Sequence, residues 1–177
     1  MRRPFTALAA LGTAAHHGYE LRASVGLVFE PFLTRRGAIA LWSATFAWWL
    51  AAARTGRTPR LAAHANGAAL GGALVHFILW PWELRGGLPA LTEAEGMTDA
   101  QLPAYNAVLR AWIAAAALAL LLETPSNGRT AALSGLAMAE PLRRSARHHF
   151  RWAREQARRE PGRWSPALRL SAAGAGR

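Results

Sequence analysis

The residues best suited to chemistry in this chain are two histidines and a glutamate near its N-terminus, His16, His17 and Glu20. Side chains three or four positions apart share one face of a helix, so the Glu20 carboxylate can lie beside either imidazole. His76 and Glu83 form a second such pair, seven positions apart. Carboxyl and imidazole groups held together can donate and accept protons. The sequence therefore predicts one catalytic group made of these five residues.

Aromatic and polar side chains are expected to surround this group and bind a substrate. Aromatic faces stabilise a developing cation. An arginine beside a carboxylate keeps it ionised, whereas an unpaired carboxyl in apolar surroundings is protonated and can act as an acid. Each of these residues could instead make only an ordinary structural ion pair or hydrogen bond. The predicted substrate-binding residues are Trp80, Tyr105, Asn106, Arg22 and Arg110.

Long apolar segments provide the elements that would position these side chains. About 17–25 mostly apolar residues suffice to cross a bilayer. Helices buried in a soluble protein usually keep a polar stripe, and these segments are apolar nearly all round. We therefore predict an all-α fold, a polytopic membrane protein built as a four-transmembrane-helix bundle. Its spans are expected at about residues 5–30, 37–53, 61–82 and 107–123.

The arginines predict how the bundle is oriented. Cytoplasmic loops of membrane proteins are enriched in positive residues, and Arg54, Arg57 and Arg60 lie in the loop after the second span. This places the protein in the cell membrane as a multi-pass protein with both termini cytoplasmic and residues 93–99 outside. A cleaved signal sequence over Met1–Ala15 is the alternative for the first segment.

The chain divides into residues 1–128, the transmembrane domain, residues 129–164, a cytoplasmic region with a basic amphipathic helix, and residues 165–177, a disordered tail. One face of the amphipathic helix is arginine-rich, as in helices that lie on anionic membranes. Neutralising these arginines should weaken binding to anionic vesicles in a salt-sensitive way. They are Arg143, Arg144, Arg147 and Arg151.

Composition excludes several classes of protein. The absence of cysteine excludes disulfides and zinc–thiolate sites, and neither a metalloprotease motif nor a phosphate-binding loop is found. The net charge of +11 lies mostly on the membrane-flanking arginines, so no nucleic-acid partner is predicted. The small residues Gly67 and Gly71 predict close helix packing within the bundle, or between copies in a homo-oligomer. His64, Glu123 and the pair His148–His149 are expected to be structural, interfacial or solvated.

Three functions fit these features. The first is a membrane-embedded enzyme that acts on a lipophilic, isoprenoid-like substrate by carboxylic-acid and base chemistry, for example cyclisation. The second is a haem- or metal-binding electron carrier, with His16 or His17 opposite His76 as ligands. The third is a non-catalytic membrane subunit or scaffold. No cofactor or metal is assigned from the sequence.

Overall fold

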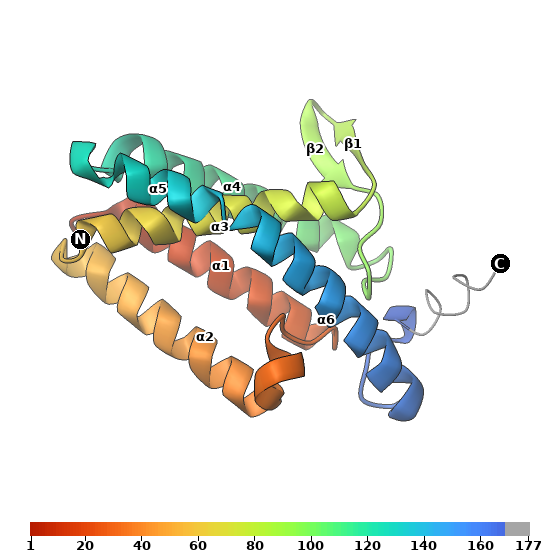
Figure 1. Ribbon diagram of the computed structural model, residues 1–177. Helices are drawn as coiled ribbons and strands as arrows, with labels where there is room; N and C mark the ends of the chain where they lie inside the picture. The colour runs from red at the N-terminus through yellow and green to blue at the C-terminus, as the bar shows by residue number, and fades with distance from the viewer. Residues whose placement is uncertain (169–177) are drawn as a thin grey trace.

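The computed structural model describes residues 1–168 as a bundle of helices with one small hairpin (Figure 1). The predicted all-α class is confirmed. The described chain contains α1 (Pro4–Arg22), α2 (Glu30–Thr55), α3 (Pro59–Leu79), α4 (Leu102–Glu123), α5 (Arg129–Leu136) and α6 (Ala139–Arg159), with the short 3₁₀ turn η1 (Ser126–Gly128) and the strands β1 (Trp82–Arg85) and β2 (Leu88–Leu91).

Two of these helices, α3 and α4, are long and apolar enough to cross a membrane. The predicted four-span bundle is therefore not confirmed. Polar residues separate α1 from this class, since it carries His16, His17 and Glu20 and stops at Arg22. The helix α2 begins with a charged turn and is broken at Thr34, where φ is 60° and ψ is 165°. Its regular part nevertheless covers the predicted second segment.

The hairpin corrects the prediction for the third segment. The helix ends at Leu79, and Trp82 begins a strand that pairs antiparallel with β2. Gly86 and Gly87 connect the strands with φ values of 61° and 79°. Two consecutive residues with positive φ are what a tight hairpin turn requires, and glycine adopts them without strain.

Close packing of α3 against α5 confirms the prediction made from the small residues Gly67 and Gly71. A methyl group at Gly67 would overlap the Ala132 carbonyl of α5, and one at Gly71 would come within 2.9 Å of the Leu136 carbonyl. On α5, a methyl group at Gly135 would overlap the His64 carbonyl of α3. The two backbones are therefore in direct contact, with glycine on both sides.

The C-terminal part of the chain overturns the predicted topology. Because α5 runs back along α3 and α6 continues in the same direction (Figure 1), the end of α6 reaches the loop after the hairpin. Arg154 forms an ion pair with Glu95 at 2.6 Å, and Ser165 Oγ donates to the Gly96 carbonyl at 2.6 Å. A cytoplasmic C-terminal region and an outside loop at residues 93–99 are incompatible with these contacts. The orientation predicted from the arginines was wrong because α6 buries its apolar face on the bundle instead of lying apart from it.

The predicted tail needs a related correction. Ser165 and Leu168 are buried, and the Ser165 amide donates to the Ser24 carbonyl at 3.0 Å. Disorder beginning at residue 165 is therefore wrong for residues 165–168. The rest of the predicted tail, 169–177, lies outside the described residues.

This arrangement predicts the result of a labelling experiment, for which the absence of native cysteine is convenient. Single cysteines at Asp99 and Glu155 should react from the same side of sealed membrane vesicles with a membrane-impermeant maleimide, and a cysteine at Arg57 should react from the other side. The reason is that α6 and the loop at residues 93–99 meet at one end of the bundle. Reaction of the cysteines at positions 155 and 57 from one side of the membrane, with the cysteine at position 99 reacting only from the other side, would contradict this fold.

Candidate functional site

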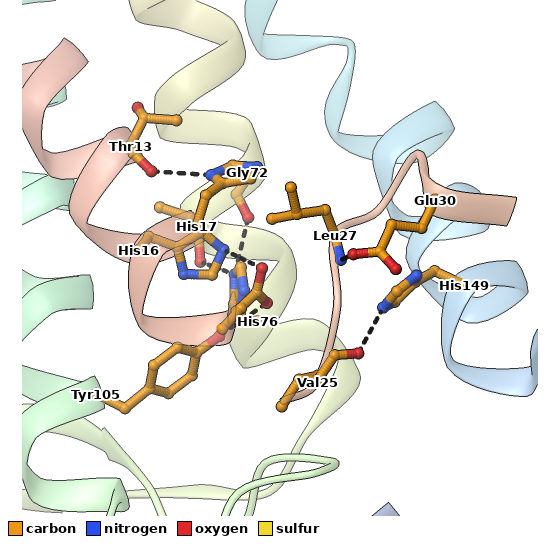
Figure 2. A network of polar contacts seen from close by, with 12 residues as sticks. Thr13, His16, His17, Val25, Leu27, Glu30, Gly72, His76, Tyr105 and His149 are labelled. Atoms are coloured by element: carbon orange, nitrogen blue, oxygen red, sulfur yellow. Dashed lines mark hydrogen bonds and ion pairs between the residues drawn. The ribbon is translucent and has the colours of Figure 1, made fainter. Parts of the chain in front are cut away.

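The predicted catalytic residues of α1 meet His76 of α3 inside the bundle (Figure 2). His16 Nε2 lies 3.5 Å from Glu20 Oε2, as the four-residue spacing predicts. The His16 and His76 rings touch edge to face, with centroids 4.7 Å apart, and the His17 ring lies 5.0 Å from that of His16. All four side chains are buried. We call His16, Glu20 and His76 the His–Glu cluster.

Backbone carbonyls orient two of the imidazoles. His76 Nδ1 is 3.0 Å from the Gly72 carbonyl oxygen, and His17 Nδ1 is 2.8 Å from the Thr13 carbonyl oxygen (Figure 2). A carbonyl oxygen can only accept, so each Nδ1 carries the hydrogen. The Nε2 atom of each neutral ring is then a lone-pair donor. In both His17 and His76, Nε2 is therefore the ring nitrogen that can accept a proton or bind a metal ion.

The Glu20 carboxyl has only long polar contacts among the described residues. Tyr105 Oη donates to Oε1 at 3.5 Å, and the His16 contact to Oε2 is also 3.5 Å. Glu20 is 8% exposed, so its carboxyl is largely removed from bulk solvent. A buried carboxyl without close partners is unusual, since nearly all buried polar groups are hydrogen-bonded. This observation makes the cluster a candidate functional site.

The His–Glu cluster forms one wall of a cavity of about 200 Å³. The other walls come from α2, α4 and α6, and they are almost entirely apolar. The other residues with polar side-chain groups on the lining, apart from the tryptophans, are His17, His149, Thr13 and Thr45. The aromatic residues on the lining are Trp42, Trp49, Trp80, Trp112 and Phe150.

Glu83 was predicted to join the cluster, and this prediction is wrong. Glu83 lies on β1 with its side chain 53% exposed and pairs with Arg85 at 2.6 Å. The helical phase that would place it beside His76 ends with α3 at Leu79. The three non-helical residues between Leu79 and Glu83 turn the carboxylate out of the bundle.

The predicted substrate-binding residues have different outcomes. Trp80 lines the cavity. Tyr105 contacts Glu20 but does not line the cavity. Asn106 instead holds the hairpin, because its side chain accepts from and donates to the backbone of Leu91.

The two arginines predicted to pair with a carboxylate do not reach the cluster. Arg110 Nε donates to the Pro89 carbonyl at 2.9 Å, so it fastens the hairpin to α4. Arg22 is exposed at the end of α1. The cluster therefore contains no guanidinium, and the prediction of an arginine-paired carboxylate is wrong.

His149 is a site residue that the sequence reasoning missed, since it was expected to be solvated. It is 3% exposed, lines the cavity, and donates from Nε2 to the Val25 carbonyl at 3.3 Å. Helical spacing could have found it, because it lies three residues after Ala146 and four before Ala153, both on the apolar face of α6. Trp42, Trp49 and Trp112 were also missed, although Trp42 and Trp49 are seven residues apart and therefore share one face of α2.

Burial lowers the pKa of His149 to about 4 from an ordinary value of 6.5. The unfolded chain then takes up a proton first, so the contribution to stability is complete above about pH 6.5 and is lost as the pH falls toward 4. We expect acidification from pH 7 to pH 5 to lower the thermal unfolding midpoint less in His149→Gln than in the native chain. His148→Gln, at an exposed position, is the control and should keep the native pH dependence. Equal sensitivity in both variants would contradict this role.

Comparison with known proteins adds no relative to this picture. No protein-family model, no curated protein and no solved structure matches the chain. The function is therefore argued from the geometry of the site.

Proposed function

We propose that the protein is an integral membrane enzyme that acts on a lipophilic, isoprenoid-like substrate by proton transfer at the His–Glu cluster. The observation that carries this proposal is the position of Glu20, His16 and His76 together on the wall of an aromatic, otherwise apolar cavity. An apolar pocket with a few convergent polar groups is the usual form of a small-molecule site.

The cavity suits a short isoprenoid or the end of a longer one. A cavity of about 150 Å³ accepts benzene, so about 200 Å³ accommodates one to two isoprene units. Trp42, Trp49 and Trp80 can present ring faces to such a ligand, and these faces favour a cationic intermediate.

The proposed reaction is an isomerisation with ring closure. The cluster donates a proton to one end of a substrate double bond, which leaves a cation on the neighbouring carbon. A second double bond attacks that carbon and closes a ring. The new cation then returns a proton to the cluster, so the product is an isomer of the substrate and no other reactant is consumed.

The membrane location rests on the apolar helices. The helix α4 is long and apolar enough to cross a membrane, and it exposes Leu118, Leu121 and Leu122. An exposed apolar surface of this kind is typical of contact with lipid. Contact of the α6 arginines with anionic headgroups is also part of the proposal. Arg147 and Arg151 are exposed, whereas Arg143 and Arg144 already share Glu140.

The geometry argues against a haem held between His16 and His76. Two axial ligands of one haem stand on opposite sides of the macrocycle, with their nitrogens about 4 Å apart because each metal–nitrogen bond is about 2 Å. The rings of His16 and His76 touch each other edge to face. No space remains between them for a porphyrin.

Photolabelling tests the proposed binding site. A diazirine derivative of geraniol should label lining residues of α2, α3 and α6 in the detergent-purified protein, and excess geraniol should compete. Ala146→Phe, which fills the cavity from α6, should reduce the labelling several-fold. Labelling confined to the outer surface of α4, without competition, would leave the scaffold function in place of the enzyme.

A further inference from the structure

The His–Glu cluster has the composition of a metal site. Two imidazoles and one carboxylate are the protein ligands of several catalytic zinc ions and of non-haem iron(II) centres. We propose that His16, Glu20 and His76 bind one divalent transition-metal ion, of the zinc or iron(II) class. This inference rests on the proposed function because it concerns the same site.

The distances fit a single ion. One ligand atom from each residue can be chosen so that all three lie within 4.8 Å of one another. Ligand atoms of a tetrahedral zinc ion are about 3.4 Å apart, given bond lengths of about 2.0–2.2 Å. The 3.5 Å between His16 Nε2 and Glu20 Oε2 already has this value. Side-chain movements of about 1 Å would complete the set.

The surroundings of the ligands are those of a metal site. A ligating histidine usually donates its second ring nitrogen to a carbonyl or carboxylate, which fixes the ring. His76 does so through Nδ1 to Gly72. The Glu20 carboxyl is otherwise poorly satisfied, since it has no polar contact shorter than 3.5 Å among the described residues. His16 differs from His76, because its second ring nitrogen, Nδ1, has no hydrogen-bond partner among the described residues.

Three protein ligands leave at least one coordination position for water or substrate, which is the mark of a catalytic and not a structural ion. All three residues line the cavity, so a bound lipophilic substrate would lie next to the ion. Glu20 is then a ligand, and the proton donor of the proposed reaction is a metal-bound water. Alternatively, a substrate oxygen takes that position, and the ion acts as a Lewis acid that polarises the bond from this oxygen to carbon.

Metal analysis of the full chain tests the proposal. The protein is purified in detergent through a tag that contains no histidine, and its metal content is measured by mass spectrometry. After chelation, the protein is titrated with Zn²⁺ and with Co²⁺ as a visible probe. We expect about one ion per chain, and a loss of affinity of about tenfold or more in each of His16→Gln, Glu20→Gln and His76→Gln. His64→Gln and His148→Gln, outside the cavity lining, should bind as the native chain does.

The outcomes separate this inference from the proposed function. Circular dichroism and gel filtration show which variants fold. Because the three ligands lie on two helices, at least one of the three variants should fold and can be tested for metal binding. A native chain that takes up neither ion, or folded ligand variants that bind normally, would overturn the metal site while leaving the photolabelling result untouched. Conversely, Ala146→Phe should lose geraniol labelling and keep its metal, so failure of the substrate proposal would not remove the ion.

Discussion

Glu20→Gln should abolish proton transfer, lowering deuterium incorporation into a geraniol-type substrate in D₂O by about 10²-fold or more. A positioned acid or base contributes about 10²–10⁴-fold to a rate, and glutamine can neither donate the proton nor replace the carboxylate as a metal ligand. The change preserves side-chain volume, so the buried position should still fold. Mass spectrometry of the recovered isoprenoid measures the incorporated deuterium.

Glu83→Gln is the matched control for this experiment. The non-helical backbone after α3 places Glu83 on the exposed hairpin beside Arg85, so its substitution should leave incorporation unchanged. An equal loss of deuterium incorporation in both variants would show that Glu83 takes part in the reaction, and this would contradict the geometry. Native incorporation in folded Glu20→Gln would remove Glu20 from the chemistry.

Gly135→Ala should lower the stability of the protein by about 3 kcal/mol or more. Overpacking commonly costs 1–3 kcal/mol, and here the added methyl group meets the His64 backbone carbonyl, which no side-chain rotation can relieve. The helices α5 and α3 must therefore separate. Thermal unfolding in detergent, followed by circular dichroism, measures the effect, and Gly67→Ala should behave in the same way.

Gly18→Ala is the control for the glycine series. A methyl group at this position of α1 would meet nothing within 4 Å, and alanine favours the helix over glycine by about 0.5–1 kcal/mol. The control should therefore raise the unfolding midpoint or leave it unchanged. A comparable rise in Gly135→Ala would disprove direct backbone contact between α3 and α5.

Helical spacing predicted the part of the site that lies inside regular helices. His16 and Glu20 meet because they are four apart on one helix, and His76 joins them near the end of a helix that the hydropathy pattern located well. The same reasoning failed at Glu83, where the helix had already ended. The consecutive glycines Gly86 and Gly87 were the available signal for a hairpin turn.

The parts that could not be predicted depend on contacts between distant segments. The residues around His149 in the sequence do not indicate that its side chain contacts the Val25 carbonyl, which belongs to a distant segment. The helix α5 is too short to cross a bilayer by itself, so no local pattern indicates that the chain continues through α6 along the bundle. Ion pairing between Arg154 and Glu95 is visible only when both segments have been placed.

The return of α6 along the bundle has a consequence for biosynthesis. Leu142, Ala146, His149 and Phe150 form one wall of the cavity, and they are synthesised after all three residues of the His–Glu cluster. A nascent chain that ends at residue 138 already contains all three residues of the His–Glu cluster, yet its cavity is open on the α6 side. The pocket can therefore be completed only after α6 has been synthesised, and a product truncated at residue 138 exposes the cluster without enclosing a substrate.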